Sequence, residues 1–430
     1  MVPEVISETA AITRAVSYGR ETKQDRSSAR RQRITEGAIV AISRYGIAGV
    51  THRRVAQEAH VSLAATTYYY GSKRDIIADA SHTLLARYVE AFERFAHRQR
   101  ENAGDMTLCD FVMRLVSNAV EQNATDSLAW CEIILNTVRD PNLRELSQTW
   151  FDTLALVWRD IAHLLRAEDV EDAATSAIDT VVGYLFLAVP LASPKSELNA
   201  LLADETWGQA SPQLAQEQRL RVDRLGPKAE ETRRRILDAA VEILVIDGAE
   251  ALTFRHVSQK AKLSIAAPTY YFSTISTLWN AAQLRLFEQA KVRYRSVMDD
   301  VEWETLSIPE LADLTTTVFM REATEFRDLS LSSYPVYLQS RREASLQAGL
   351  AAINAEQLHR WRQALGVVAP HETSKAAWIM YALFTGKLIR AMATGTQTRS
   401  LRNVRKEFTY DITALAAGSH WSTQNNGTSV

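Results

Sequence analysis

Apolar residues recur along this chain with the spacing of an α-helix. In residues 31–45 most of them fall three or four positions apart, which gathers them on one helical face; they are Ile34, Ala38, Ala41, Ile42 and Tyr45. The same stripe returns at Ile236, Ala240, Ile243 and Leu244. Long helical stretches follow both segments, and no run alternates apolar and polar residues as a strand does. The pattern predicts an all-α protein.

Helix boundaries are marked in the same way after both stripes. Gly46 and Gly248 follow the first predicted helix, where a glycine readily takes the left-handed conformation that ends a helix. Hydroxyl residues suited to N-caps then precede two short helices; they are Thr51, Ser62, Thr253 and Ser264. Each segment therefore predicts one long helix and two short ones.

These segments are two copies of one sequence. Residues 31–70 overlie residues 233–272 without a gap, and the positions that are identical are Arg31, Arg33, Ile34, Ala38, Gly46, Thr51, Arg53, Val55, Gln57, Ala59, Ser62, Ala64, Ala65, Thr67, Tyr68 and Tyr69. After a one-residue insertion the match continues, with Arg139, Leu143, Trp158, Arg159 and Gly183 on Arg342, Leu346, Trp361, Arg362 and Gly386. A repeat of this length is a duplicated domain rather than a solenoid unit.

The duplication predicts an ordered series of domains. They are a basic flexible arm (1–26), a first helix-turn-helix domain (27–73), a first regulatory helical domain (74–192), a linker (193–227), a second helix-turn-helix domain (228–275), a second regulatory helical domain (276–418) and a disordered tail (419–430). The arm carries Arg14, Arg20, Lys23, Arg26, Arg30, Arg31 and Arg33. A solvated tail is one interpretation of this arm, and contact with the minor groove is the other.

The chemistry of the third helix suits the major groove of DNA. Small residues such as Ala64 and Ala65 let a backbone approach base edges, while hydroxyl groups reach bases or phosphates. Arg53, in the preceding helix, can take a guanine edge with two hydrogen bonds. Tyr70 is expected to point inward, because Phe272 replaces it in the second copy. Residues 51–70 therefore predict a helix-turn-helix unit.

Two segments of the chain resemble the DNA-binding domain of TetR family regulators. They are RITEGAIVAISRYGIAGVTHRRVAQEAHVSLAATTYYYGSKRDII in the first copy and RRRILDAAVEILVIDGAEALTFRHVSQKAKLSIAAPTYYFSTISTLWNAA in the second. The resemblance implies base-side roles in the first copy for Arg53, Leu63, Ala64, Ala65, Thr67 and Tyr68, and phosphate-side roles for Thr51, Tyr69 and Lys73. The matching positions in the second copy are Arg255, Ile265, Ala266, Ala267, Thr269, Tyr270, Thr253 and Tyr271. Two departures stand out, since Ile275 replaces Lys73 and Pro268 replaces Thr66.

The family works as a homodimer, so the resemblance implies an intramolecular pseudo-dimer with both heads on one chain. Its four-helix interface is expected from residues 142–165 and 173–189 against 344–365 and 373–393, with Gly183 and Gly386 at close approaches. An operator with unlike half-sites follows from the difference between the copies. Whether such chains pair further stays open.

Charge and composition limit which partners and cellular locations are expected. The net charge of -2 offers no general attraction to nucleic acid, so a basic surface must be local. Cys109 and Cys131 are too few for a disulfide framework, and no apolar run reaches the ~20 residues that span a bilayer, which predicts a cytoplasmic protein. No motif for catalysis, a cofactor or a metal is found, so no enzyme is expected.

The expected function is a bacterial transcriptional repressor that a small hydrophobic effector releases from double-stranded DNA. Candidate pocket residues are the aromatic side chains Phe111, Trp130, Trp150, Tyr184, Phe319, Tyr334, Tyr337 and Trp378. Two alternatives remain. In one, only the first helix-turn-helix binds DNA and the second copy serves dimerisation and sensing. In the other, the protein is a small-molecule carrier or interaction module without DNA binding.

Overall fold

The computed structural model describes residues 23–101, 104–191, 226–248, 251–299, 301–368, 373–395 and 401–418. These residues form 17 α-helices, and no strand occurs among them. Within the described ranges no helix is both long enough and apolar enough to cross a bilayer. The all-helical prediction is confirmed for this part of the chain.

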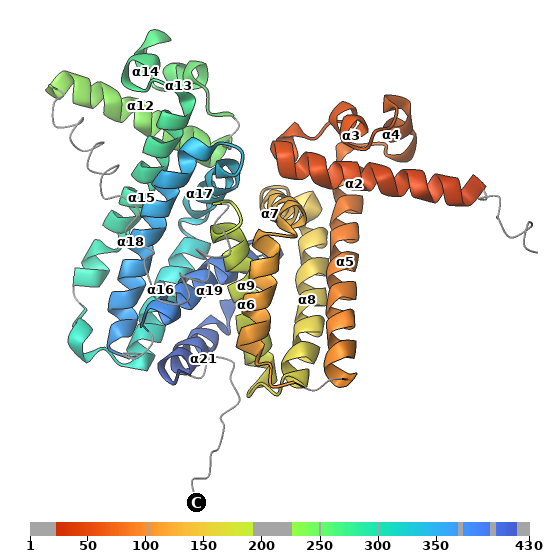
Figure 1. Cartoon of the computed structure of the whole chain (residues 1–430). Helices are drawn as coiled ribbons and strands as arrows, with labels where there is room; N and C mark the ends of the chain where they lie inside the picture. The colour runs from red at the N-terminus through yellow and green to blue at the C-terminus, as the bar shows by residue number, and fades with distance from the viewer. Residues whose placement is uncertain are drawn as a thin grey trace, which may run out of the picture.

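The first half consists of a head and a body. The head contains α2 (Lys23–Gly49), α3 (His52–Glu58) and α4 (Leu63–Tyr69). The body contains α5 (Lys73–Glu101), α6 (Leu108–Val120), α7 (Ala124–Arg139), the short 3-10 helix η1 (Pro141–Leu143), α8 (Arg144–Leu164) and α9 (Val170–Leu187). Helix α2 lies across the end of α7, and α5 runs from the head down the body (Figure 1).

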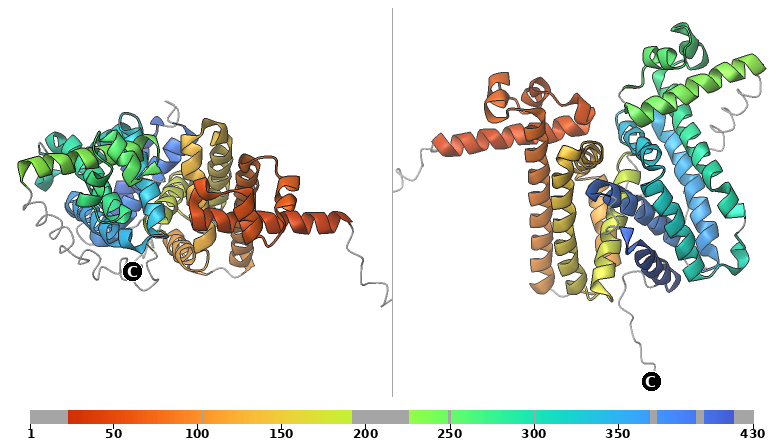
Figure 2. Two further views of the ribbon diagram at one scale, coloured as in Figure 1. Left: turned by 90° about the horizontal axis from the view of Figure 1, so that it is seen from above. Right: turned by 180° about the vertical axis from the view of Figure 1, so that it is seen from behind.

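The second half repeats this order. Its head contains α12 (Pro227–Ile246), α13 (Phe254–Lys260) and α14 (Ala266–Tyr271). Its body contains α15 (Ile275–Asp299), η3 (Trp303–Thr305), α16 (Ile308–Ala323), α17 (Arg327–Ser340), η4 (Ala344–Leu346), α18 (Gln347–Gly366), α19 (Thr373–Thr394) and α21 (Val404–Ala416). Both heads lie at the same end of the molecule, each over its own body (Figures 1 and 2).

Most predicted helix boundaries agree with the structure. Gly46 and Gly248 take positive φ angles of 68° and 89°, which is the left-handed region that favours glycine. The hydroxyls of Thr51, Ser62 and Thr253 each accept a backbone N–H from the first turn of the helix that follows. These side chains satisfy amides that have no partner within the helix.

Ser264 does not cap its helix, which corrects the expectation for that residue. Helix α14 begins at Ala266 after Ile265, without a side-chain cap, and is one residue shorter than α4. Pro268 has no N–H, so the carbonyl of Ser264, four residues earlier, receives no helical hydrogen bond from it. The proline therefore shortens α14 at its N-terminal end.

The predicted ends of the domains lie mostly outside the described residues. Helix α2 begins at Lys23, so the last residues of the predicted arm (1–26) are helical, while residues 1–22 are not described. Residue 192, the last of the predicted first regulatory domain, residues 193–225 of the predicted linker and the tail at 419–430 are not described either. Gly226 and Pro227, at the end of that linker, are the N-cap and first residue of α12.

Helices α9 and α19 join the two halves by crossing at two glycines. A Cβ on Gly183 would lie 1.7 Å from the carbonyl oxygen of Ala382, and a Cβ on Gly386 would lie 1.8 Å from that of Asp179. Only glycine permits backbones this close, so the predicted role of these glycines is confirmed. Of the four helices expected at this interface, α8 also contacts both α9 and α19, while α18 contacts α19.

Candidate nucleic-acid interface

Helix α4 of the first head turns one face outward and the other into the core. Leu63 and Tyr68 are 51% and 81% exposed, although both are large and hydrophobic. On the opposite face Thr66 is buried, and Tyr70, directly after the helix, is 4% exposed. The inward direction expected for Tyr70 is therefore confirmed. The exposed face is the one that a helix-turn-helix presents to a major groove.

A buried polar network anchors α4 to α2 and α5. The Tyr70 and Thr35 hydroxyls both donate to the carboxylate of Asp79, Thr35 at 2.6 Å. Arg31 reaches the same carboxylate at 2.7 Å. Burial works against the charge of Asp79, but these hydrogen bonds outweigh it and lower the pKa of its carboxyl. The network fixes the end of α4 against the long helices.

The residues assigned to DNA in the first head lie on or beside the exposed face. Thr51, Arg53, Ala64 and Thr67 are exposed, and Ala65, Tyr69 and Lys73 are half-buried. No hydrogen bond or ion pair engages the guanidinium of Arg53 within the described part of the chain.

Neighbouring backbone and hydroxyl groups orient the side chains at the rim of this face. The Tyr69 hydroxyl lies 3.0 Å from the hydroxyl of Ser27 on α2. The Lys73 ammonium lies 3.4 Å from the carbonyl of Ala48. These contacts tie the predicted phosphate-side residues to the ends of α2.

The second head presents a matching face. Ile265 and Tyr270 are 67% and 83% exposed, close to the values for Leu63 and Tyr68. Other residues assigned to DNA here are also exposed; they are Thr253, Arg255, Ala266 and Thr269. Ala267 and Tyr271 are half-buried, like their counterparts in the first head. Both heads therefore carry an outward pair of one aliphatic and one tyrosine side chain.

The interior behind that face differs between the heads. Leu237, Phe272 and Ala281 occupy the positions of Thr35, Tyr70 and Asp79. The Arg233 guanidinium lies over the Phe272 ring at 5.5 Å from its centroid. Burial lowers the pKa of Arg233. Apolar packing and a cation–π contact replace the buried polar network.

Arg342 connects the first head to the second body. Its guanidinium donates to the carbonyl oxygen of Ser43 on α2 at 3.0 Å and to that of Ile42 at 3.3 Å. It also pairs with Glu132 of α7 at 2.6 Å. The carbonyls belong to the last regular turn of α2 before Gly46, where a cation is favoured by the helix dipole.

Arg139, the counterpart of Arg342, lies at the other head. A Cβ on Gly248 would come within 2.7 Å of its guanidinium nitrogen Nη1. Burial lowers the pKa of Arg139, while Asp328 partly offsets this. Sequence reasoning found both arginines identical across the halves but assigned them no role. Arg342 thus lies against α2, and Arg139 lies against Gly248, just beyond the end of α12.

The predicted pocket residues lie in the interiors of the bodies and at the contact between them. Trp130 contacts Trp150, whose indole N–H donates to Ser81 at 2.8 Å. Phe319 is fully buried between Phe384 and Phe408.

The remaining aromatic candidates lie close to the boundary between the halves. Tyr184 stacks on Trp378 across that boundary, at 6.1 Å between ring centroids. Tyr334 packs against Phe186 of the first body. These aromatic residues therefore do not gather in one place, and their assignment to a pocket stays a prediction.

The second body holds a polar group that the first lacks. The hydroxyls of Tyr337 and Tyr381 both donate to the amide oxygen of Asn354, at 2.7 and 3.0 Å. The Asn354 amide nitrogen is buried without a hydrogen-bond partner among the described residues. No group of three metal-ligating side chains occurs among them either.

Comparison with known proteins bears on the second body. No curated protein matches the chain. Residues 307–412, which contain α16 to α19 and most of α21, match the sequence model of a family described as the tetracyclin repressor-like C-terminal domain. The similarity to this family lies within the second body.

Proposed function

We propose that this protein is a sequence-specific DNA-binding transcriptional regulator that carries two DNA-reading heads on one chain. The observation that carries the proposal is the repeated exposure of a large aliphatic residue and a tyrosine on α4 and α14. Exposed apolar pairs are costly in water, and a groove offers them thymine methyl groups and sugar edges. The TetR-like second body supports the same function.

The two halves are proposed to form an intramolecular pseudo-dimer. The contacts at the crossing of α9 and α19 support this, because exchanging each residue for its repeat counterpart turns one contact into the other. Gly183 lies against Ala382, and Gly386 lies against Asp179. Such reciprocal contacts are typical of two-fold interfaces. The placement of both heads at one end of the molecule agrees with this arrangement (Figure 2).

Repression released by a small effector is the proposed mode of regulation. Helices α5 and α15 run from the heads into the bodies, so a ligand that changes their angle moves the heads relative to each other. It does so only if it binds the released state better, with a coupling of typically ~1–3 kcal/mol. Arg342 and Arg139 add a route by which each body acts on the opposite head.

A second candidate keeps DNA binding in the first head alone. Ile275, which packs against the core, stands where the first head has Lys73, so a charged phosphate contact is missing there. The shorter α14 also favours DNA binding by the first head alone. In this version the second copy serves pairing and sensing, and its head only resembles a DNA reader.

Substitution of the two arginines distinguishes these functions. Arg53→Ala and Arg255→Ala are each expected to cost ~1–3 kcal/mol of binding to the DNA upstream of the coding region if both heads read bases. Arg94→Ala, which removes an exposed arginine of α5 that pairs with Glu90, is the matched control. Loss with Arg53→Ala alone supports the single-head version. Absence of salt-dependent binding in the unaltered protein contradicts both and leaves a carrier or interaction module.

A further inference from the structure

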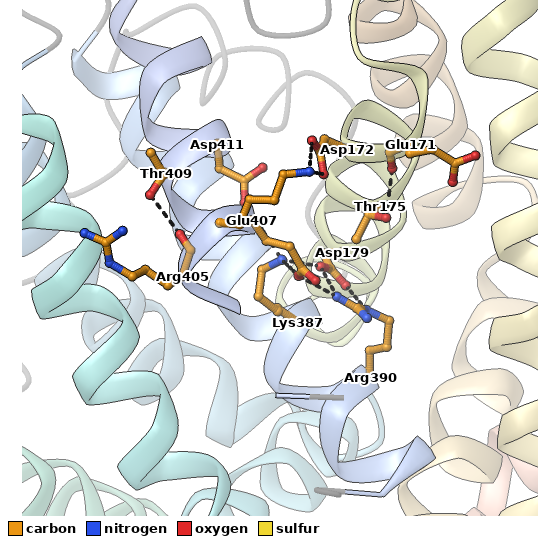
Figure 3. Close-up of polar contacts among 11 residues, drawn as sticks. Glu171, Asp172, Thr175, Asp179, Lys387, Arg390, Arg405, Glu407, Thr409 and Asp411 are labelled. Carbon is orange, nitrogen blue, oxygen red and sulfur yellow. Dashed lines mark hydrogen bonds and ion pairs between the residues drawn. The ribbon is translucent and has the colours of Figure 1, made fainter. Parts of the chain in front are cut away.

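A charged cluster is buried where the two halves meet. Asp179 of α9 and Lys387 of α19 are 0% and 1% exposed, and their charged atoms lie 2.8 Å apart. Arg390 grips both oxygens of Asp179 at 2.6 and 2.8 Å. Glu407 and Asp411 of α21 complete the cluster from the other side of Lys387 (Figure 3).

Pairing within the cluster offsets the cost of burial. Burial raises the pKa of Glu407, but Lys387 and Arg390 outweigh it and lower that pKa to about 2. Even so, a buried ion pair commonly stabilises no more than apolar residues of the same volume. Removal of one partner, in contrast, leaves an uncompensated charge and is strongly destabilising. The cluster therefore contributes less to stability than to the choice of partner.

The charges are divided unevenly between the repeats. At the offset that relates Gly183 to Gly386, Asp179 corresponds to Ala382, while Lys387 and Arg390 correspond to Tyr184 and Leu187. Across the α9–α19 crossing, the first half thus supplies only the acid and the second half only the bases. Glu407 and Asp411 belong to the same half as the bases, so they accompany them in any pairing.

This division penalises the pairing of like halves. If α19 crossed α19 of another chain at the same glycines, Lys387 and Arg390 would meet Ala382 in place of Asp179. If α9 crossed α9, Asp179 would meet Tyr184 and Leu187 without a base. Only the unlike pair satisfies both sets of charges, which is the arrangement in this structure.

We propose that the cluster of Asp179, Lys387, Arg390 and Glu407 selects pairing of the first half with the second half and disfavours pairing between like halves of two chains. The inference rests on the proposed pseudo-dimer and concerns its partner choice. A chain with two similar interface helices would otherwise associate with further copies of itself. Burial of opposite charges on opposite halves prevents this, as polar core residues do in other helix pairs.

The test moves the acid from one half to the other in the full-length chain. The double variant Asp179→Ala/Ala382→Asp keeps composition and net charge but places acid and bases on the same helix. Like halves then become complementary, and we expect the association constant between chains to rise about a hundredfold. Glu145→Ala/Ala348→Glu makes the same exchange at two exposed, equivalent positions and serves as the control.

The readout is co-capture of two differently tagged chains expressed together, with the mass of the complex from sedimentation. The acid-relocated variant should be captured as a two-chain complex, while the unaltered protein and the control should not. A second variant, Asp179→Leu/Lys387→Met/Arg390→Leu/Glu407→Gln, removes the acids and the bases of the cluster together, so no unpaired carboxylate of Glu407 stays buried, and it should fold with reduced selectivity. The proposal is overturned if neither variant increases co-capture, or if unaltered chains already associate through this interface. No DNA enters the assay, so its result is independent of DNA binding.

Discussion

A single methyl group at the α9–α19 crossing should separate the two halves. A Cβ on Gly183 would lie 1.7, 2.4 and 2.7 Å from three backbone atoms of Ala382. Backbone atoms cannot rotate away as a side chain can, so Gly183→Ala must push the helices apart. Restoring an ordinary contact of at least 3.4 Å to the carbonyl oxygen requires a large movement for a close-packed interface.

Two opposing effects determine how much Gly183→Ala changes the free energy of unfolding. Alanine is favoured over glycine within a helix by about 1 kcal/mol, and this alone would stabilise the variant. Overpacking in a close-packed core costs about 1–3 kcal/mol, and rigid backbone neighbours place this site at the upper end. We therefore expect Gly183→Ala to lower the free energy of unfolding by about 2 kcal/mol. Gly386→Ala should behave alike, and the double variant should cost less than the sum because both glycines act at one crossing.

Urea unfolding followed by circular dichroism measures this directly. Gly366→Ala is the control, because Gly366 ends α18 and a Cβ added there would meet nothing within 4 Å. It should be neutral or gain up to about 1 kcal/mol. If Gly183→Ala gains stability as the control does, the close crossing of α9 and α19 is refuted.

Three further predictions concern the ion cluster and the heads. Burial raises the pKa of Asp411 to about 7 from 3.8, so between these pH values the folded state holds a proton that the unfolded chain releases. That release favours the unfolded state, so the free energy of unfolding falls as pH rises from about 4 to 7. Asp411→Asn should flatten this slope and gain up to about 4 kcal/mol at pH 8 in urea titrations, and an unchanged slope would contradict the burial of that charge. Arg342→Met should weaken DNA binding through the first head by about tenfold in fluorescence anisotropy, because the α2 carbonyls lose their donor, whereas equal affinity would show that the contact does not position the head. Tyr70→Phe should destabilise the protein by about 1–2 kcal/mol, since Asp79 loses a donor, and a neutral result would mean that water replaces the hydroxyl.

The sequence was a good guide to helices and caps because these depend on near neighbours. The stripes of Ile34 and Ile236, the left-handed Gly46 and Gly248 and the inward Tyr70 follow from local periodicity and from comparison of the two copies. Ser264 was the exception. Its place resembles that of Ser62, but Pro268, four residues on, shortens the helix.

Contacts between the halves could not be predicted in the same way. Asp179 lies in an apolar stretch of α9, and its partners Lys387 and Arg390 lie in another helix more than 200 residues away. Periodicity says which face of a helix is buried but not which charges meet there. The mismatch of Asp179 with Ala382 across the repeat was the available signal, and it becomes informative only once the crossing at Gly183 is known.

The aromatic residues proposed for a ligand pocket show a different limit. Trp130, Trp150 and Phe319 are buried, as large apolar side chains usually are, yet burial alone does not distinguish a core from a binding site. Asn354 attracted no attention in the sequence because a single asparagine in a helix has no characteristic pattern. Only the structure shows that its amide nitrogen is buried without a hydrogen-bond partner among the described residues.

The composition of a protein–DNA complex tests the central claim most directly. Duplexes selected from a random-sequence library by the full-length protein are to be footprinted, and the mass of the complex is to be measured by sedimentation. Two heads on one chain predict one chain per duplex, with two protected half-sites about one helical turn, roughly 34–36 Å, apart. One half-site per chain, or two chains on each duplex, would contradict the account.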